Sequence, residues 1–178
     1  ISKQALNRLS GLETLGDPPF DSVLLPAGDP ELRGIAPLLA YYDVDPARIR
    51  FLGTALWDEA RGLGTEPALV GGWYAAPAPE SRLIFEDKFE RAFNRRPPRL
   101  ASLGYDAMLL AVALTYADGG TDYSPSALTD TNGFAGVDGI FRFLGDGTNQ
   151  RGLAVMEVRE RDVRVIDPAP TSFTDLQF

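Results

Sequence analysis

The feature that most constrains the fold is a strand, a capped helix and a second strand within residues 20–57. FDSVLLP at 20–26 is rich in β-forming residues, and RIRFLGTALW at 48–57 is a second such run whose strand ends near Gly53. Between them Asp29 and Pro30 favour a helix start, because the carboxylate caps free amides and proline occupies a position that needs no N–H. This order predicts parallel strands joined by a right-handed crossover.

The helix and a third strand extend this unit into a sheet. Apolar residues recur at helical spacing after Pro30, with Pro37 inside the helix as an expected kink, and ALVGGWYAA at 68–76 contains the third strand. We expect strands near 20–26, 48–53 and 70–75 to be parallel neighbours. The fold class is therefore α/β, with a parallel Rossmann-like sheet flanked by helices. Ligands of such sheets bind beyond the carboxyl ends of the strands, which points to residues 26–29, 54–58 and 74–77.

Two further helices follow the extended link APAPE at 76–80. Residues 80–94 are amphipathic, with Phe85, Phe89 and Phe93 spaced by four, and RRPPR at 95–99 ends this helix. The helix at about 100–117 is apolar on nearly every side and therefore needs neighbours all round. Near the start of the chain, residues 1–9 have the pattern of the end of a helix, with Ala5, Leu6 and Leu9 on one side.

The stretch GFAGVDGIFRFLGDGTNQRGLAVMEV at 133–158 contains no residue that suggests chemistry. Phe141 and Phe143 alternate in a first strand, 145–147 is a glycine-rich turn, and Leu153 and Val155 alternate in a second strand. We interpret it as a hairpin that closes the edge of a structure built earlier in the chain. A further strand is expected from Val163 to Ile166.

Composition excludes several function classes. The chain has no Cys and no His, which removes thiolate nucleophiles, Ser-His-Asp relays, zinc sites and haem ligation. Its 25 acidic residues show no spacing that singles out a catalytic pair, so we expect no enzyme, no cofactor and no metal. A net charge of −8 without a basic stripe argues against nucleic acid as a partner. The longest apolar run, 101–116, is too short to span a bilayer and contains Asp106, so we expect a buried helix.

The order of these segments resembles a known family. A Phe-rich helix, then RRPPRLASLGYDAMLLAVAL, then the 133–158 stretch is similar to the C-terminal half of the type I periplasmic binding proteins. The likeness is strongest to the branch that binds branched-chain amino acids and to the bacterial penicillin-binding protein activators. Tyr105-Asp106-Ala107 and Gly136 to Glu157 carry the match.

The resemblance implies a two-lobed protein that closes on a small molecule, with a chain that crosses three times between the lobes. Residues 1–77 would be the first part of the second lobe, 78–132 a helical segment that crosses back to the first lobe, and 133–178 the hairpin and strand that complete the second lobe. The first lobe would lie outside this sequence. The helix at 100–117 would then pack on that lobe or on a second copy of the chain.

Two functions follow as expectations from the resemblance. The first is a periplasmic solute-binding protein of an ABC transport system, which takes a small polar or branched-chain-amino-acid-like ligand to a membrane permease. The second is a periplasmic regulator that activates a penicillin-binding protein, a cell-wall synthase, without transport. Either protein would be periplasmic, or anchored by a lipid and facing the periplasm. The two differ in the cleft, since a binder needs polar groups placed to satisfy a zwitterion, whereas a regulator can leave the cleft filled or flat.

The candidate ligand-binding residues are Thr54, Trp57, Asp58 and Tyr74, all near strand ends. Each has a structural alternative: Trp57 as a core side chain, Asp58 as a solvated loop or cap residue, and Tyr74 as a cover for the sheet edge. Asp106 is more simply an internal hydrogen-bond acceptor or a helix-start carboxylate than a ligand contact. The pair Arg95-Arg96 is expected in a solvated loop.

Overall fold

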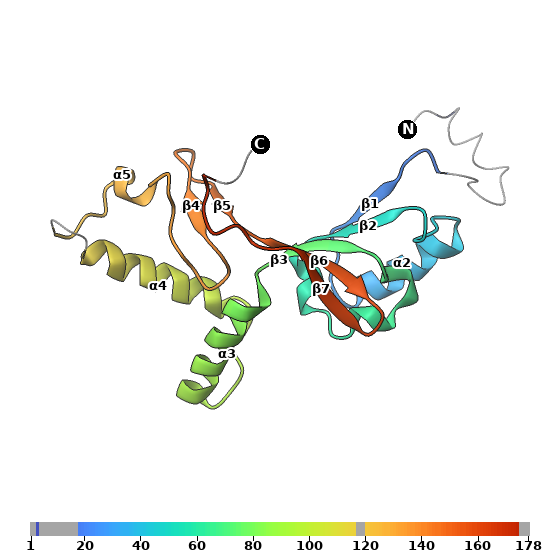
Figure 1. Ribbon diagram of the computed structural model, residues 1–178, viewed down its shortest axis with the longest axis horizontal. Helices are drawn as coiled ribbons and strands as arrows, with labels where there is room; N and C mark the ends of the chain where they lie inside the picture. Colours follow the sequence, from blue (N-terminus) through green and yellow to red (C-terminus); the bar gives the residue numbers. More distant parts are fainter. Residues whose placement is uncertain (1–2, 4–17, 117–119, 175–178) are drawn as a thin grey trace. The chain divides into compact units, whose positions relative to one another are not determined.

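The computed structural model describes residue 3 and residues 18–116 and 120–174. The chain forms two compact units (Figure 1). Unit 1 comprises the chain up to Tyr74 together with Met156–Arg164, and unit 2 comprises Ala75–Val155 and the chain from Val165 onward. The helix expected over residues 1–9 lies almost wholly outside the described residues.

Unit 1 is built on the expected parallel strands. β1 (Ser22–Leu25) pairs with β2 (Arg50–Gly53), and β2 pairs with β3 (Trp73–Ala76), in both cases in parallel. The prediction of parallel neighbours is therefore confirmed, and with it the α/β fold class.

Helix α2 (Glu31–Tyr41) connects β1 to β2, with Pro37 inside it as expected. The predicted cap is wrong, because the helix begins after Pro30 and no side chain caps it. The Asp29 carboxylate instead lies 3.0 Å from the Arg33 guanidinium, one helical turn on. A cation one turn away competes for the same oxygens, and residue spacing alone does not show which donor the carboxylate takes.

The sheet has five strands in the order β1-β2-β3-β6-β7. Three short 3₁₀ helices lie between β2 and β3: η1 (Ala55–Glu59), η2 (Leu63–Thr65) and η3 (Pro67–Leu69). β6 (Ala154–Arg159) and β7 (Asp162–Asp167) are joined by only two residues, and Arg161 in that link has φ of +63°. The strand predicted from Val163 to Ile166 lies within β7.

Unit 2 consists of helices and a small hairpin. Its helices are α3 (Pro79–Phe93), α4 (Ala101–Thr115) and the short α5 (Pro125–Leu128). The rings of Phe85, Phe89 and Phe93 in α3 are in tilted contact in series, and Phe85 also contacts Tyr105 of α4 at 5.2 Å between ring centres. β4 (Phe141–Phe143) pairs in antiparallel fashion with β5 (Asn149–Arg151) in a separate two-stranded sheet (Figure 1).

The predicted pairing within residues 133–158 is thus wrong. The partner of β4 is β5, whereas residues 154–159 form β6 and lie between β3 and β7 in the larger sheet. The stretch therefore contains three strands, and β7, not β6, ends the sheet on that side. The sequence misled because β5, with residues Asn149–Arg151, is polar, whereas Leu153 to Met156 is a continuous apolar run.

Helix α4 is only partly covered within this chain. Leu110 and Leu114 pack against Phe141, but several large apolar side chains of the same helix are exposed. The helix is thus only partly buried within this chain, which agrees with the expectation that it needs neighbours outside it. The exposed set is Leu103, Tyr105, Met108, Leu109 and Val112. None of the helices in the described parts of the chain is long and apolar enough to span a membrane.

Candidate functional site

The predicted site lies at the carboxyl ends of β1, β2 and β3 in unit 1. Two loops meet there: residues 26–30 after β1, and Thr54 with helix η1 after β2. A Cβ atom added to Gly28 would lie 3.6 Å from Cβ of Leu56, so the two loops are in van der Waals contact. Parallel strands bring such loops together, as expected for a ligand-binding edge.

Thr54 is the N-cap of η1. Its hydroxyl oxygen accepts a hydrogen bond from the Leu56 amide at 3.4 Å, and its carbonyl oxygen accepts one from the Trp57 amide at 3.0 Å. The Thr54 side chain is half-buried. Since a contact of 3.4 Å is long for a hydrogen bond, the hydroxyl keeps capacity for another partner.

Trp57 is fully buried, with 0% of its surface exposed. Its indole N–H donates to the Leu25 carbonyl at 3.1 Å, and its ring centre lies 5.8 Å from that of Tyr74. The indole fits here because residues 53 and 72 are glycines. A Cβ atom built at Gly53 would lie 2.3 Å from the Trp57 ring, and one built at Gly72 would lie 2.9 Å from it. In this structure Trp57 therefore acts as a core side chain that fixes the ends of β1, β2 and β3.

Asp58 and Tyr74 occupy different positions. Asp58 is half-buried in η1, next to Trp57, whereas Tyr74 is only 4% exposed and contacts the Trp57 ring. The structure thus brings Trp57 and Tyr74 together in the core, below the carboxyl edge of the sheet. Thr54 and Asp58 lie along η1. Thr54 and Asp58 are the two candidates that are only half-buried.

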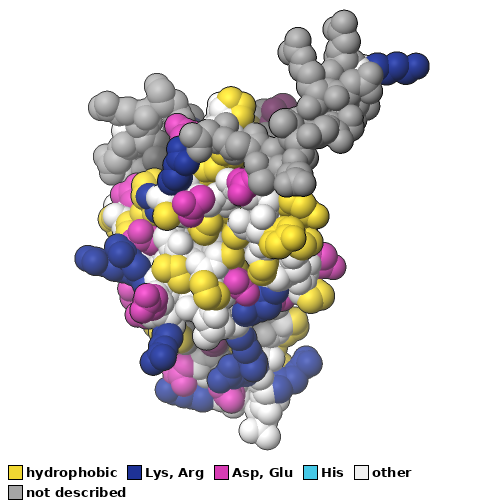
Figure 2. Space-filling view, turned by 90° about the vertical axis from the view of Figure 1, so that its right-hand side faces the viewer, with side chains coloured by type: hydrophobic (Ala, Val, Ile, Leu, Met, Phe, Trp, Pro, Cys, Tyr) yellow, Lys and Arg dark blue, Asp and Glu magenta, His cyan; other side chains and the backbone are white. Residues whose placement is uncertain are grey.

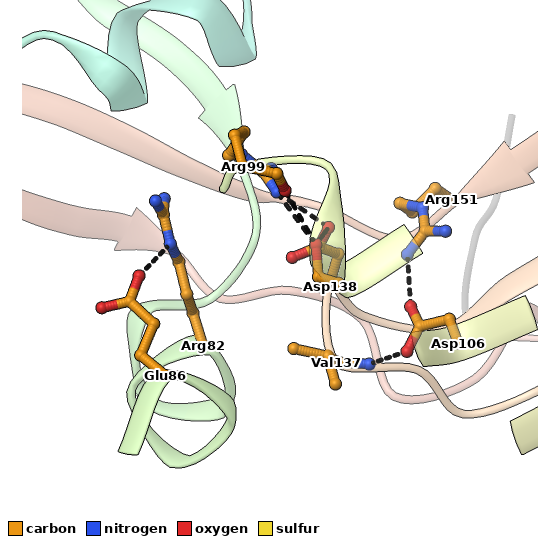
Figure 3. Close-up of polar contacts among 8 residues, drawn as sticks. Arg82, Glu86, Arg99, Asp106, Val137, Asp138 and Arg151 are labelled. Carbon is orange, nitrogen blue, oxygen red and sulfur yellow. Dashed lines mark hydrogen bonds and ion pairs between the residues drawn. The ribbon is translucent and has the colours of Figure 1, made fainter. Parts of the chain in front are cut away.

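A second polar cluster lies in unit 2, around the first turns of α4 (Figure 3). Asp106 is 2% exposed; one carboxylate oxygen accepts the Val137 amide at 2.7 Å, and the other lies 3.3 Å from the Arg151 guanidinium. A Cβ at Gly136 would lie 2.5 Å from that carboxylate, so only glycine admits the contact. Asp106 is therefore an internal acceptor, as expected from the sequence.

Asp138 is the second buried carboxylate of this cluster, also 2% exposed. One oxygen accepts from the Ser102 hydroxyl at 2.7 Å and from Arg99 at 3.0 Å, while the other oxygen has no partner among the described atoms. Sequence reasoning missed this residue, because its partners lie 36 and 39 residues away along the chain. The segments YDA at 105–107 and GVDG at 136–139, which carry the family resemblance, are thus part of one hydrogen-bonded network. This network connects α4 to the loop before β4.

The remaining described residues offer few alternatives for a site. No group of three or more His, Cys, Asp or Glu side chains among them could hold a metal ion. One cavity of about 600 Å³ in unit 1 is lined by residues around η2, η3 and the β6–β7 link, and neither Thr54 nor Asp58 is among them. Figure 2 shows one face of the protein, where apolar side chains lie among acidic and basic ones.

Comparison with known proteins finds solved structures with a similar fold. No family model and no curated protein matches the chain. Among solved structures, a putative branched-chain amino acid ABC transporter protein from Rhodospirillum rubrum superposes with a TM-score of 0.62 at 23% identity, over 82% of this chain and 44% of that one. A periplasmic ligand-binding protein of a branched-chain amino acid ABC transporter from Burkholderia xenovorans gives 0.53 at 15% identity, over 84% and 42%.

The third comparison is the C-domain of LpoA from Haemophilus influenzae, a regulator of PBP1A. It superposes with a TM-score of 0.53 at 14% identity, over 82% of this chain and 44% of that one. At these identities the likeness shows the fold alone. The chain therefore shares an α/β fold with parts of these proteins, and it spans less than half of their length.

Proposed function

We propose that this chain is part of a periplasmic solute-binding protein of an ABC transport system. Its ligand is a small polar or branched-chain-amino-acid-like molecule, and its protein partner is a membrane permease. The observation that supports this most is the pair of loops in contact at the carboxyl ends of β1 and β2, with Thr54 and Asp58 on the second. The fold shared with two ABC-transporter proteins agrees with it.

Ligand recognition follows from the chemistry of η1. The Thr54 hydroxyl can donate to a carboxylate, and the Asp58 carboxylate can accept from an ammonium group, so the two suit opposite ends of a zwitterion. Trp57 and Tyr74 hold η1 in place from below and need not touch the ligand.

The proposed site also needs the lobe that lies outside this sequence. The large apolar side chains left exposed on α4 require a cover, and the chain spans only 44% of the Rhodospirillum protein. We assign that cover to the lobe outside this sequence, which in the proposal also supplies most of the grip on the ligand.

The test is ligand-dependent thermal unfolding of the full-length protein with leucine, isoleucine, valine and small aromatic acids. A ligand at 100 times its dissociation constant stabilises by about 2.7 kcal/mol, which is a readily measured shift. Asp58→Asn should weaken binding of the amino acid, whereas Glu59→Gln, a matched change at the exposed next residue of η1, should not. An absence of any shift, or equal effects of the two variants, would count against solute binding.

The second candidate is regulation of a cell-wall synthase. It is favoured by a specific observation: the Trp57 indole and the buried Tyr74 are used within the core, so half of the candidate groups do not face a ligand. The shared fold with the LpoA C-domain is compatible with it. Binding of the full-length protein to a purified class A penicillin-binding protein, with no effect of amino acids on thermal unfolding, would favour this function over transport.

A further inference from the structure

The cavity of about 600 Å³ in unit 1 is lined by a pair of opposite charges. They belong to Glu160 and Arg161, two exposed residues that form the whole link between β6 and β7. Within the described parts of the chain neither side chain has a hydrogen bond or an ion pair, whereas the preceding Arg159 pairs with Glu157. A cation and an anion therefore lie next to each other at this cavity without partners.

The backbone that carries these two charges is fixed against helix η2. The Arg161 amide donates to the Gly64 carbonyl at 3.0 Å, and a Cβ atom at Gly64 would lie 2.0 Å from the Arg159 carbonyl oxygen, so only glycine admits this contact. Arg161 itself has φ of +63°, a left-handed conformation for which such turns favour Gly or Asn. A long cationic side chain thus occupies a position that disfavours it, and strained backbone of this kind is concentrated at functional sites.

The other walls of the cavity supply a hydroxyl group and apolar surface. Thr65 donates its hydroxyl hydrogen to the Gly62 carbonyl at 2.8 Å, so the hydroxyl oxygen can still accept from a ligand. Pro67 and Val70 provide the apolar part of the lining. The volume lies in the range of small-molecule sites, in which apolar walls surround a few polar groups that orient the ligand.

We propose that this cavity binds a small zwitterion with an apolar side chain, such as an aliphatic amino acid. The Arg161 guanidinium pairs with the ligand carboxylate, the Glu160 carboxylate pairs with the ligand ammonium group, and the apolar walls contact the ligand side chain. A carboxylate without an ammonium group, or an amine without a carboxylate, fits less well because one of the two neighbouring charges repels it. The site does not depend on the one proposed at η1, since neither Thr54 nor Asp58 lines this cavity.

NMR titration of the isotope-labelled chain with leucine tests this site at the backbone amides of Thr65 and Val70. Both signals should shift until they saturate. Two compounds with the leucine skeleton are matched probes: isocaproate, which lacks the ammonium group, and isoamylamine, which lacks the carboxylate. Each should bind about tenfold more weakly than leucine or worse, since each loses one charge-assisted contact. The amides of Leu56 and Asp58 report the η1 site in the same spectra, so failure of one proposal is distinguishable from failure of the other.

Two variants each remove one of the charges. Glu160→Gln and Arg161→Gly should each raise the dissociation constant for leucine about tenfold or more. Arg164→Gln, at an exposed residue of β7 that does not line the cavity, is the control and should leave the constant unchanged. Because glycine adopts a φ of +63° without strain, Arg161→Gly should leave Tm unchanged or raise it while binding is lost.

Each other outcome contradicts the proposal. Without leucine-dependent shifts at Thr65 and Val70, the cavity binds no such zwitterion. Equal binding of isocaproate would mean that Arg161 alone forms an anion site. Unchanged binding in Glu160→Gln or Arg161→Gly, or an equal loss in Arg164→Gln, would show that these two charges do not hold the ligand. A clearly lower Tm in Arg161→Gly would show that Arg161 serves the stability of the turn instead.

Discussion

Single carboxylates hold unit 2 together through contacts that span long stretches of chain. Asp106 joins α4 to the Val137 amide and to Arg151 of β5. We predict that Asp106→Ala lowers the free energy of unfolding by about 1–3 kcal/mol, because the partly buried Val137 N–H and the Arg151 guanidinium both lose their partner. Urea unfolding measures this. Asp130→Ala, at an exposed residue of the same unit, is the control; a similar loss there would mean that Asp106 has no special role.

At the tip of the β4–β5 turn, Asp146 titrates under the influence of Thr148. The Thr148 hydroxyl, and after it the Thr148 amide, hydrogen-bond the carboxylate and lower the pKa of Asp146. A folded-state pKa below the unfolded one adds stability above the unfolded pKa, and this is lost as pH falls through the folded pKa.

We therefore expect Thr148→Val to raise the pKa of Asp146 toward its ordinary value, since the hydroxyl contact is lost and the amide contact stays. NMR titration of the Asp146 carboxyl carbon measures this. The pKa of Asp122, which is lowered by Ser124, is an internal reference and should not move. An unchanged Asp146 pKa in the variant would show that the amide alone sets it.

At the scale of elements, the absence of a side chain at Gly53 lets η1 pack closely against the sheet. We predict that Gly53→Ala destabilises unit 1 by about 1–3 kcal/mol, because the new methyl group would meet the Trp57 ring at 2.3 Å. Gly34→Ala in α2 should act in the opposite direction, by about 0.5–1 kcal/mol, since no atom lies within 4 Å and alanine favours helix. Thermal unfolding of both variants checks the two signs; equal signs would contradict this packing.

The sequence was sufficient for elements whose signal is local. The strands near β1, β2 and β3, their parallel pairing and the helices α3 and α4 follow from apolar spacing and turn residues within short windows. The pairing of β4 with β5 was not predictable, because the polar residues of β5 carry no alternation and their partner is set by the turn at 145–147.

For the candidate site, the sequence predicts a place in the sheet but not which side chains are exposed there. Topology alone predicts the carboxyl edge of the sheet, but the burial of Trp57 depends on Gly53 and on Gly72. Asp138 was missed for a related reason, since its partners Arg99 and Ser102 approach it only after α4 has packed on the loop before β4. Long-range contacts of this kind leave no periodic pattern in a single sequence.

For the whole molecule, the exposed face of α4 determines how the 178-residue chain behaves on its own. Met108 is 65% exposed in an apolar stretch, and each large side chain left in water forgoes about 1.5–3 kcal/mol of burial. We expect the isolated chain to self-associate through this face. Met108→Lys should raise the dissociation constant roughly tenfold or more, because tenfold corresponds to about 1.4 kcal/mol.

Sedimentation equilibrium over a range of protein concentrations measures this association. Tyr41→Lys, at a side chain of α2 that is 78% exposed, places the same charge in unit 1 and should leave the dissociation constant unchanged. The full-length protein should not associate, because in our proposal the additional lobe covers α4. A monomeric isolated chain at every concentration, or equal effects of the two lysines, would show that the α4 face needs no cover and would remove the main structural argument for a missing lobe.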